Sequence, residues 1–129
     1  MSQDDPLEEL YVDKADINKE RLTNALSDTI GIDRESGDAV MLPDYSDLSQ
    51  SQKVFAYLLY RRAAHELGHL EEDEYGINGP DLSDASGVPQ GTLEPVASDS
   101  PIIENESSKG GYVISEFAIP EAINELGQE

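Results

Sequence analysis

Two histidines separated by three residues are the first side chains in this sequence that could do chemistry. His65, Glu66 and His69 form the pattern H-E-x-x-H within the stretch AAHELGH. On a helix, residues four apart lie on one face, so both imidazoles could bind one zinc ion while the carboxylate between them activates a bound water molecule. The pattern therefore offers the hypothesis of a small zinc metallopeptidase in which His65 and His69 are ligands and Glu66 is the general base.

Two features of the sequence argue against that zinc centre. His65 and His69 are the only histidines in the chain, so a third ligand would have to be one of its many carboxylates, none of which stands at a diagnostic spacing. Gly68 lies between them, and helices commonly end at a glycine in the left-handed conformation. A helix that ends there takes His69 away from the face that carries His65. We therefore expect no catalytic residue, no metal and no cofactor, and keep the peptidase as an alternative.

The net charge is the strongest compositional feature of the chain. Its 129 residues include 8 Lys and Arg against 28 Asp and Glu, which gives a net charge of −20. The acids are spread between apolar residues along the whole chain, unlike the blocks of like charge that are typical of disordered arms. Such a surface is typical of proteins from salt-adapted hosts, because in molar salt the Debye length falls to roughly 3 Å and self-repulsion is screened. We expect a halophilic archaeon, or its virus, as the source.

The absence of some residue types and patterns limits the classes of protein further. The chain has no Cys, which excludes disulfides and thiolate metal sites. It has no apolar run of the length that a membrane span needs, and its acidic first residues lack the pattern of a signal peptide. We therefore expect a cytoplasmic protein that does not bind membranes.

The spacing of apolar residues divides the chain into three parts: an acidic arm over 1–14, a helix and a short hairpin over 15–48, and the main domain over 49–129. In the second part, apolar residues at intervals of three and four predict a helix that starts at Asp16 and ends at Gly31. The turn RESGD followed by the apolar AVML then predicts the hairpin.

The main domain begins with the clearest helix of the sequence. Ser49 and Gln52 form a capping box at its start, and apolar residues cover most of its circumference, which is typical of a central core helix. Gly68 is expected to end it. The acidic stretch EEDEYGIN that follows is interpreted as a linker.

After this stretch, the sequence predicts two further helices and a hairpin. A short helix is expected from near Pro80, followed by a tight turn at Gly87 and a second helix with Pro89 as its first residue. Strands are predicted over 102–103 and 112–114, joined by a polar, Gly-rich tip. A final amphipathic helix would carry Phe117, Ile119, Ala122, Ile123 and Leu126.

The order helix, turn, helix and hairpin resembles the winged helix-turn-helix domains of haloarchaeal and haloviral proteins. The stretches that carry the resemblance are DLSDASGVPQGTLEPV and IIENESSKGGYVIS. The resemblance covers residues 50–126 and implies a mainly α fold with a small β-hairpin, an α+β class. It also implies a DNA-binding transcriptional regulator whose second helix enters the major groove while the wing contacts the backbone. The DNA contacts that it implies are Gln90, Thr92 and Glu94 on the second helix, Lys109 at the wing tip, and Lys53, Arg61 and Arg62 on the first helix.

The second helix departs from the pattern of a DNA reader. The stretch PQGTLEPVASD holds two acids and no Lys or Arg, although most contacts to phosphate and guanine come from basic side chains. Pro95 is also expected to kink or shorten this helix. A protein-interaction or viral assembly module on the same fold is therefore the first alternative to the regulator. The expected partners are double-stranded DNA, a second copy of the chain, or another protein.

Overall fold

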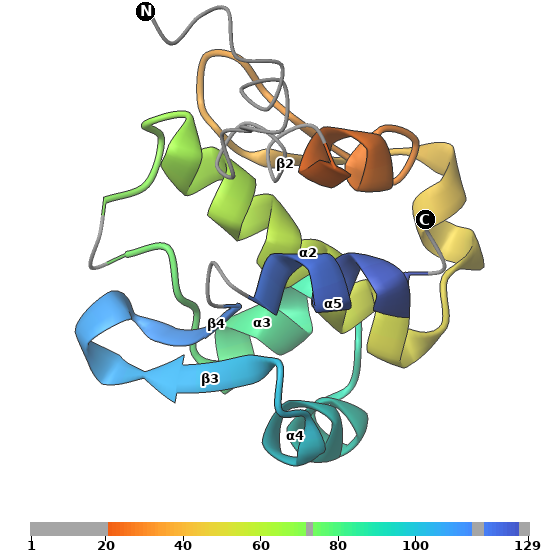
Figure 1. Ribbon diagram of the computed structural model, residues 1–129, viewed down its shortest axis with the longest axis vertical. Helices are drawn as coiled ribbons and strands as arrows, with labels where there is room; N and C mark the ends of the chain where they lie inside the picture. Colours follow the sequence, from red (N-terminus) through yellow and green to blue (C-terminus); the bar gives the residue numbers. More distant parts are fainter. Residues whose placement is uncertain (1–20, 72–73, 115–117, 127–129) are drawn as a thin grey trace, which may run out of the picture.

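Helix α2 (Gln50–Glu66) runs through the middle of the molecule, and the other elements pack around it (Figure 1). The computed structural model describes residues 21–71, 74–114 and 118–126. The predicted capping box is confirmed, because the Ser49 hydroxyl accepts from the Gln52 N–H and the Gln52 side chain accepts from the Ser49 N–H. The prediction of a core helix is confirmed as well, since a continuous run of α2 is buried: Val54, Phe55, Ala56, Tyr57, Leu58, Leu59 and Tyr60.

A helical segment and a hairpin cover one side of α2 (Figure 1). Residues 21–26 are helical, and the antiparallel strands β1 (Ile30–Ile32) and β2 (Ala39–Met41) follow. The predicted hairpin is confirmed, but the prediction that Gly31 ends the helix is wrong. Helical structure ends at residue 26, and Gly31 pairs with Val40 inside β1. The predicted acidic arm over 1–14 and helix start at Asp16 lie outside the described residues.

Helices α3 (Gly79–Ser86) and α4 (Gln90–Asp99) follow α2 and pack against it. The tight turn between them is confirmed, since Gly87 has φ 79° and its N–H donates to the Ser83 carbonyl. Pro89 was predicted as the first residue of this helix. It is instead the N-cap, and α4 begins one residue later, at Gln90. A 3-10 helix, η3 (Pro43–Asp47), connects β2 to α2 on the N-terminal side.

Pro95 lies inside α4, which continues past it for four residues to Asp99. Pro95 was predicted to kink or shorten this helix; the helix does not end at Pro95, and the kink stays a prediction. A proline lacks the N–H that would bond to the carbonyl four residues earlier, here that of Gly91. Gly91 is exposed, so water can satisfy its carbonyl. Placed this way, the proline interrupts the hydrogen-bond ladder without leaving a buried polar group alone.

The second hairpin is confirmed, with a longer first strand than predicted. β3 (Ile103–Glu106) and β4 (Gly111–Ile114) are antiparallel, and the short η4 (Ser107–Lys109) forms the tip between them. Ile77, just before α3, forms a bridge with Tyr112 of β4 through hydrogen bonds of 3.1 and 2.8 Å. The segment between α2 and α3 is thereby attached to the outer side of the hairpin.

The predicted final helix is present as α5 (Ile119–Glu125), which buries Ile119, Ala122 and Ile123 and packs against α2. Phe117, which was expected on the same face, lies outside the described residues. The architecture is thus a small, mainly helical α+β domain with two short antiparallel hairpins. Within the described ranges, no helix is both long enough and apolar enough to cross a membrane.

Candidate functional site

Helix α2 ends between the two histidines of the H-E-x-x-H pattern. Its last residue is Glu66, and Gly68 has the left-handed φ of 90° that was predicted for the helix end. The His69 N–H donates to the Ala64 carbonyl at 2.9 Å and the Gly68 N–H to the His65 carbonyl at 3.0 Å, which is the hydrogen-bond pattern of a Schellman cap. The chain therefore leaves the helix before His69.

The two imidazoles pack against different parts of the molecule. The His65 ring stacks on Tyr75, with 4.4 Å between ring centroids, and its Nδ1 lies 2.9 Å from the Leu70 carbonyl oxygen. The His69 ring packs on the β1–β2 turn, since its Cβ and Cγ lie 2.7 Å from the position that a Cβ on Gly37 would occupy. His65 and His69 thus do not form a pair of ligands on one helix face.

The carboxylate of Glu66 forms an ion pair with a neighbouring arginine. This carboxylate lies 3.4 Å from Nη2 of Arg62, one turn earlier on α2. Among the residues that the structure describes, no three His, Cys, Asp or Glu side chains are grouped so that they could hold a metal ion. The described residues therefore do not bring together the imidazole pair and third ligand that a zinc centre of this pattern needs.

Cationic side chains instead gather around a buried tyrosine. We call Tyr75, Arg61, Arg62, His65 and Lys109 the Tyr75 cluster. Tyr75 is only 3% exposed, and the Arg62 guanidinium and the Lys109 ammonium lie 5.2 and 5.8 Å from its ring centroid. Arg62 also donates to the Tyr75 hydroxyl at 3.1 Å. At these distances the ring attracts both cations through its quadrupole.

Arg61 connects the cluster to the backbone of the segment between α2 and α3. Its guanidinium donates to the carbonyls of Tyr75 at 3.0 Å and Glu74 at 2.7 Å. The next residue, Gly76, donates its N–H to the Lys109 carbonyl at 2.7 Å. The interpretation of this stretch as a linker is therefore wrong for residues 74–78, because α2 and the β3–β4 hairpin both hold them in place.

The basic residues predicted to contact phosphate are thus engaged within the protein. Arg61, Arg62 and Lys109 belong to the Tyr75 cluster, and the Lys53 ammonium lies 5.6 Å from the ring centroid of Tyr45. Arg62 is buried, and the other three are half-buried. The predicted cations do not form one exposed patch on α2.

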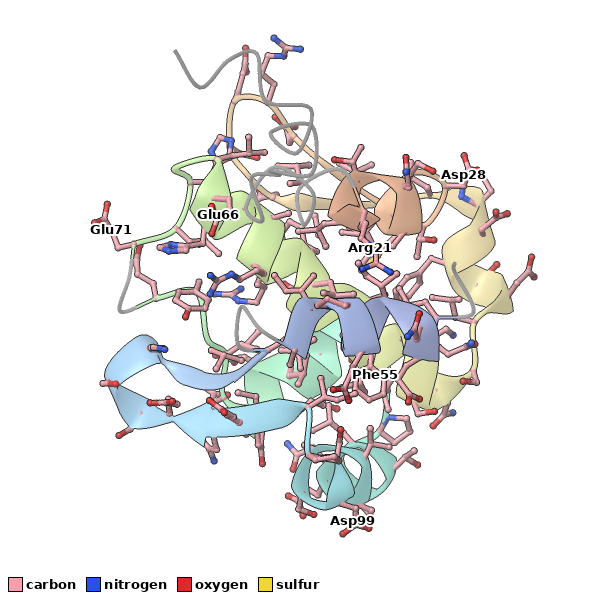
Figure 2. All side chains as sticks on the ribbon, viewed as in Figure 1. Arg21, Asp28, Phe55, Glu66, Glu71 and Asp99 are labelled. Atoms are coloured by element: carbon pink, nitrogen blue, oxygen red, sulfur yellow. The ribbon has the colours of Figure 1, made fainter. Side chains whose placement is uncertain are left out.

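The predicted reading face of α4 is exposed but carries no cation. Gln90, Thr92 and Glu94 lie in solvent, while Leu93 and Ala97 of the same helix are buried. Asp99, at the end of the same helix, lies at the end of the molecule away from Glu66 (Figure 2). The exposed side of α4 is therefore polar and acidic.

Tyr45 anchors the turn that precedes α4. Its hydroxyl donates to the Ser86 carbonyl at 2.5 Å. Burial, together with the neighbouring Tyr57, raises the pKa of Tyr45 to about 12. Tyr60 makes the equivalent contact with the β1–β2 turn at Gly37, and burial likewise raises the pKa of Tyr60 to about 12. Neither anchor has a local sequence signal, because each joins residues more than 20 positions apart.

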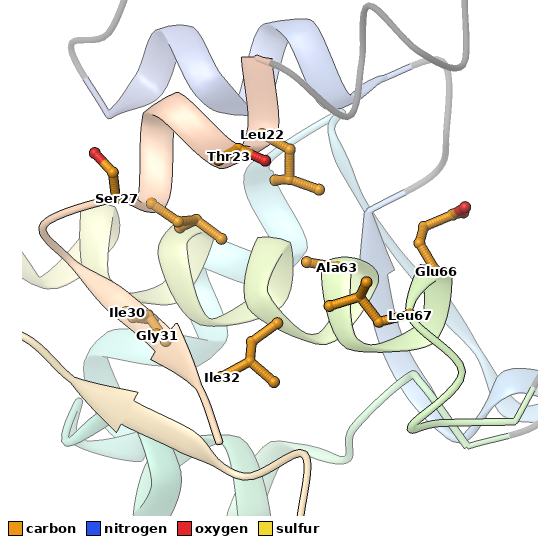
Figure 3. A pocket seen from close by; sticks show the side chains of 10 residues that line it. Leu22, Thr23, Ser27, Ile30, Gly31, Ile32, Ala63, Glu66 and Leu67 are labelled. Atoms are coloured by element: carbon orange, nitrogen blue, oxygen red, sulfur yellow. The ribbon is translucent and has the colours of Figure 1, made fainter. Parts of the chain in front are cut away.

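An apolar pocket of about 450 Å³ lies between the helical segment 21–26, strand β1 and the end of α2 (Figure 3). Sequence reasoning did not find it, because its walls come from three separate parts of the chain. The residues that line it are Leu22, Thr23, Leu26, Ser27, Ile30, Gly31, Ile32, Ala63, Glu66 and Leu67.

Comparisons with known proteins do not assign this arrangement to a family. The chain has no significant match among protein-family models, curated proteins or solved structures. Its function is therefore inferred from the geometry and chemistry of its own surface.

Proposed function

We propose that residues 50–126 form a winged-helix domain that works by binding a protein partner through α4, as an interaction or assembly module. The order α2, α3, α4 and then the β3–β4 hairpin supports the winged-helix assignment. So does the exposed outer face of α4, the second helix of its helix-turn-helix pair, since this is the element that such domains use for contact.

The observation that carries the choice of a protein partner is the location of the cations. Duplex DNA is held mainly by Lys and Arg side chains that neutralise phosphates, and guanine is read by the same residue types. Here the four candidates, Lys53, Arg61, Arg62 and Lys109, contact the protein's own tyrosines and carbonyls. A protein interface requires no such excess of positive charge.

The acidic composition is compatible with a protein partner in a salt-adapted host. In molar salt the Debye length is roughly 3 Å, so repulsion between two acidic surfaces is screened. The same salt weakens DNA binding, because the release of condensed counterions no longer drives it. Neutral polar groups such as those of Gln90 and Thr92 keep their hydrogen-bonding capacity under these conditions.

The test is to select binding sequences from a pool of randomised duplex DNA with the full chain, once in dilute and once in molar potassium chloride. We expect no enriched sequence in either buffer. A motif that is enriched by the native chain and lost with Gln90→Ala would overturn the protein-partner proposal. Ser46→Ala, a change at an exposed residue of η3, is the control that should leave any binding unchanged.

A DNA-binding transcriptional regulator is the second candidate, and one observation favours it. Gln90, Thr92 and Glu94 are all exposed at the start of α4, where recognition helices contact base edges. A glutamine side chain can pair with adenine, and a glutamate can accept from cytosine. These contacts need no cation, so the enriched motif expected for this candidate would contain both bases.

A further inference from the structure

The apolar pocket beside the end of α2 has the size of a small-molecule site, and the proposed function does not use it. Its volume of about 450 Å³ lies within the range of roughly 300–1,000 Å³ that ligand pockets span. Its apolar walls include Leu22 of the helical segment, Ile30 and Ile32 of β1, Ala63 of α2 and Leu67 just after the end of α2, as Figure 3 shows. Leu26 also lines the pocket.

The described part of the chain leaves one lining residue of the pocket, Leu67, largely exposed. Its side chain is 67% exposed, compared with 44% for Val40 and 42% for Met41, the other exposed large apolar residues in the described part of the chain. An apolar molecule in the pocket would remove this leucine from water, which is favourable in proportion to the area covered.

The charge at the pocket defines the class of ligand. Among its described lining residues, Glu66 is the one with an ionisable side chain, and hydroxyl groups come from Thr23 and Ser27. We propose that the pocket binds a small molecule with an apolar body and an ammonium head group, the head group lying at Glu66.

The contacts of Glu66 connect this site to the second hairpin. Its carboxylate pairs with Arg62 at 3.4 Å, and Arg62 donates to the Tyr75 hydroxyl at 3.1 Å. The Tyr75 ring in turn carries Lys109, the last residue of η4 at the hairpin tip. An ammonium group at Glu66 competes with Arg62 for the carboxylate, so ligand binding changes the surroundings of Tyr75. Because His65 stacks on Tyr75, the chemical shifts of His65 should change as well.

The head-group test uses three eight-carbon probes, octylammonium, octanol and octanoate, each titrated below its micellar concentration into the ¹⁵N-labelled full chain. We expect saturable shifts of the Leu22, Ala63 and Leu67 amides, with affinity in the order ammonium, alcohol, carboxylate. Glu66→Gln should weaken octylammonium about fivefold, the value of one partly exposed ion pair, and leave octanol unchanged. Glu94→Gln, the same change on α4, is the control and should have no effect.

The shape test fills or opens the pocket. Ala63→Phe should abolish binding of all three probes, with circular dichroism confirming that the domain is folded. Leu67→Gln changes an exposed side chain and so leaves the fold intact, and it should weaken octylammonium, whereas Met41→Gln should not. No saturable shift at the pocket, equal binding of octanoate, or shifts at Leu67 that follow protein concentration instead of probe concentration would each overturn the proposal.

Discussion

The Tyr75 cluster and helix α4 use polar side chains in opposite ways. In the cluster, arginine, lysine and histidine side chains are directed onto one buried ring and onto nearby carbonyls. Along α4, Gln90, Thr92 and Glu94 lie in solvent. The cations of the Tyr75 cluster therefore stabilise the fold, and the exposed candidate contact helix is acidic. The difference shows that basic residues near a predicted recognition helix are not by themselves a phosphate-binding surface.

Among the variants that test this difference, Tyr75→Ala should cause the largest loss of stability. The substitution removes a buried aromatic ring together with the surface on which two cations and an imidazole pack. We expect the free energy of unfolding to fall by about 3 kcal/mol or more. Urea unfolding followed by circular dichroism measures the loss. Thr92→Ala on α4 is the matched surface change, and a comparable loss there would contradict the assignment of the two regions.

Two identical glycine substitutions should have effects of opposite sign. A Cβ on Gly76 would lie 2.7 Å from the Lys109 carbonyl oxygen and 2.9 Å from the Gly111 nitrogen, whereas a Cβ on Gly91 of α4 would meet nothing within 4 Å. Neither glycine has a positive φ. Gly76→Ala should therefore destabilise the domain by about 2 kcal/mol, and Gly91→Ala should stabilise it by about 0.5 kcal/mol.

Urea midpoints of the two variants test this contrast. A stable Gly76→Ala variant would mean that the segment at 74–78 is not held closely against the hairpin. A destabilised Gly91→Ala variant would mean that this position of α4 is not open to solvent.

Alkaline unfolding should report on the anchor that positions α4. Because burial raises the folded-state pKa of Tyr45 to about 12 from an ordinary value of 10.0, its stabilising contribution is complete below pH 10 and is lost as the pH rises to about 12. The loss is on the order of 1–2 kcal/mol. Tyr45→Phe should reduce this alkaline loss, although Tyr60 still contributes in the same range. An unchanged pH profile in Tyr45→Phe would contradict the anchor.

For the two histidines we expect a small effect of substitution and no effect of zinc. His65→Ala should cost about 1 kcal/mol through the lost stacking on Tyr75. Added zinc chloride should leave the thermal midpoint of the native chain and of both His65→Ala and His69→Ala unchanged. Stoichiometric zinc in the native chain that is absent from both variants would restore the metallopeptidase hypothesis and make Glu66→Gln the next variant to measure.

Local signals in the sequence predicted the features that depend on neighbouring residues. Ser49 with Gln52 identified the start of α2, and Gly68 and Gly87 identified the ends of two helices. These positions are readable because capping groups and left-handed glycines act within a few residues. The interpretation of Gly31 failed because strand pairing with Val40, nine positions away, determines its conformation.

The contacts that define the candidate sites were beyond sequence reasoning for the same reason. Arg62 and Tyr75 are 13 positions apart, and Lys109 reaches the same ring from the hairpin tip. In the sequence, Tyr75 stands in an acidic stretch with no apolar periodicity, which gave no indication that it is buried. Gln90, Thr92 and Glu94 of α4 are exposed, and their assignment as contact residues stays a prediction.

The most direct measurement for the central claim is photo-crosslinking from α4 inside the source cells. A benzophenone side chain replaces Glu94, and the same side chain at Asp47 of η3 is the control, since both positions are exposed. The account predicts that position 94 yields a defined adduct with one protein that nuclease treatment leaves unchanged, and that position 47 does not. An adduct at position 94 that nuclease removes would contradict the account and identify this chain as a nucleic-acid-binding regulator.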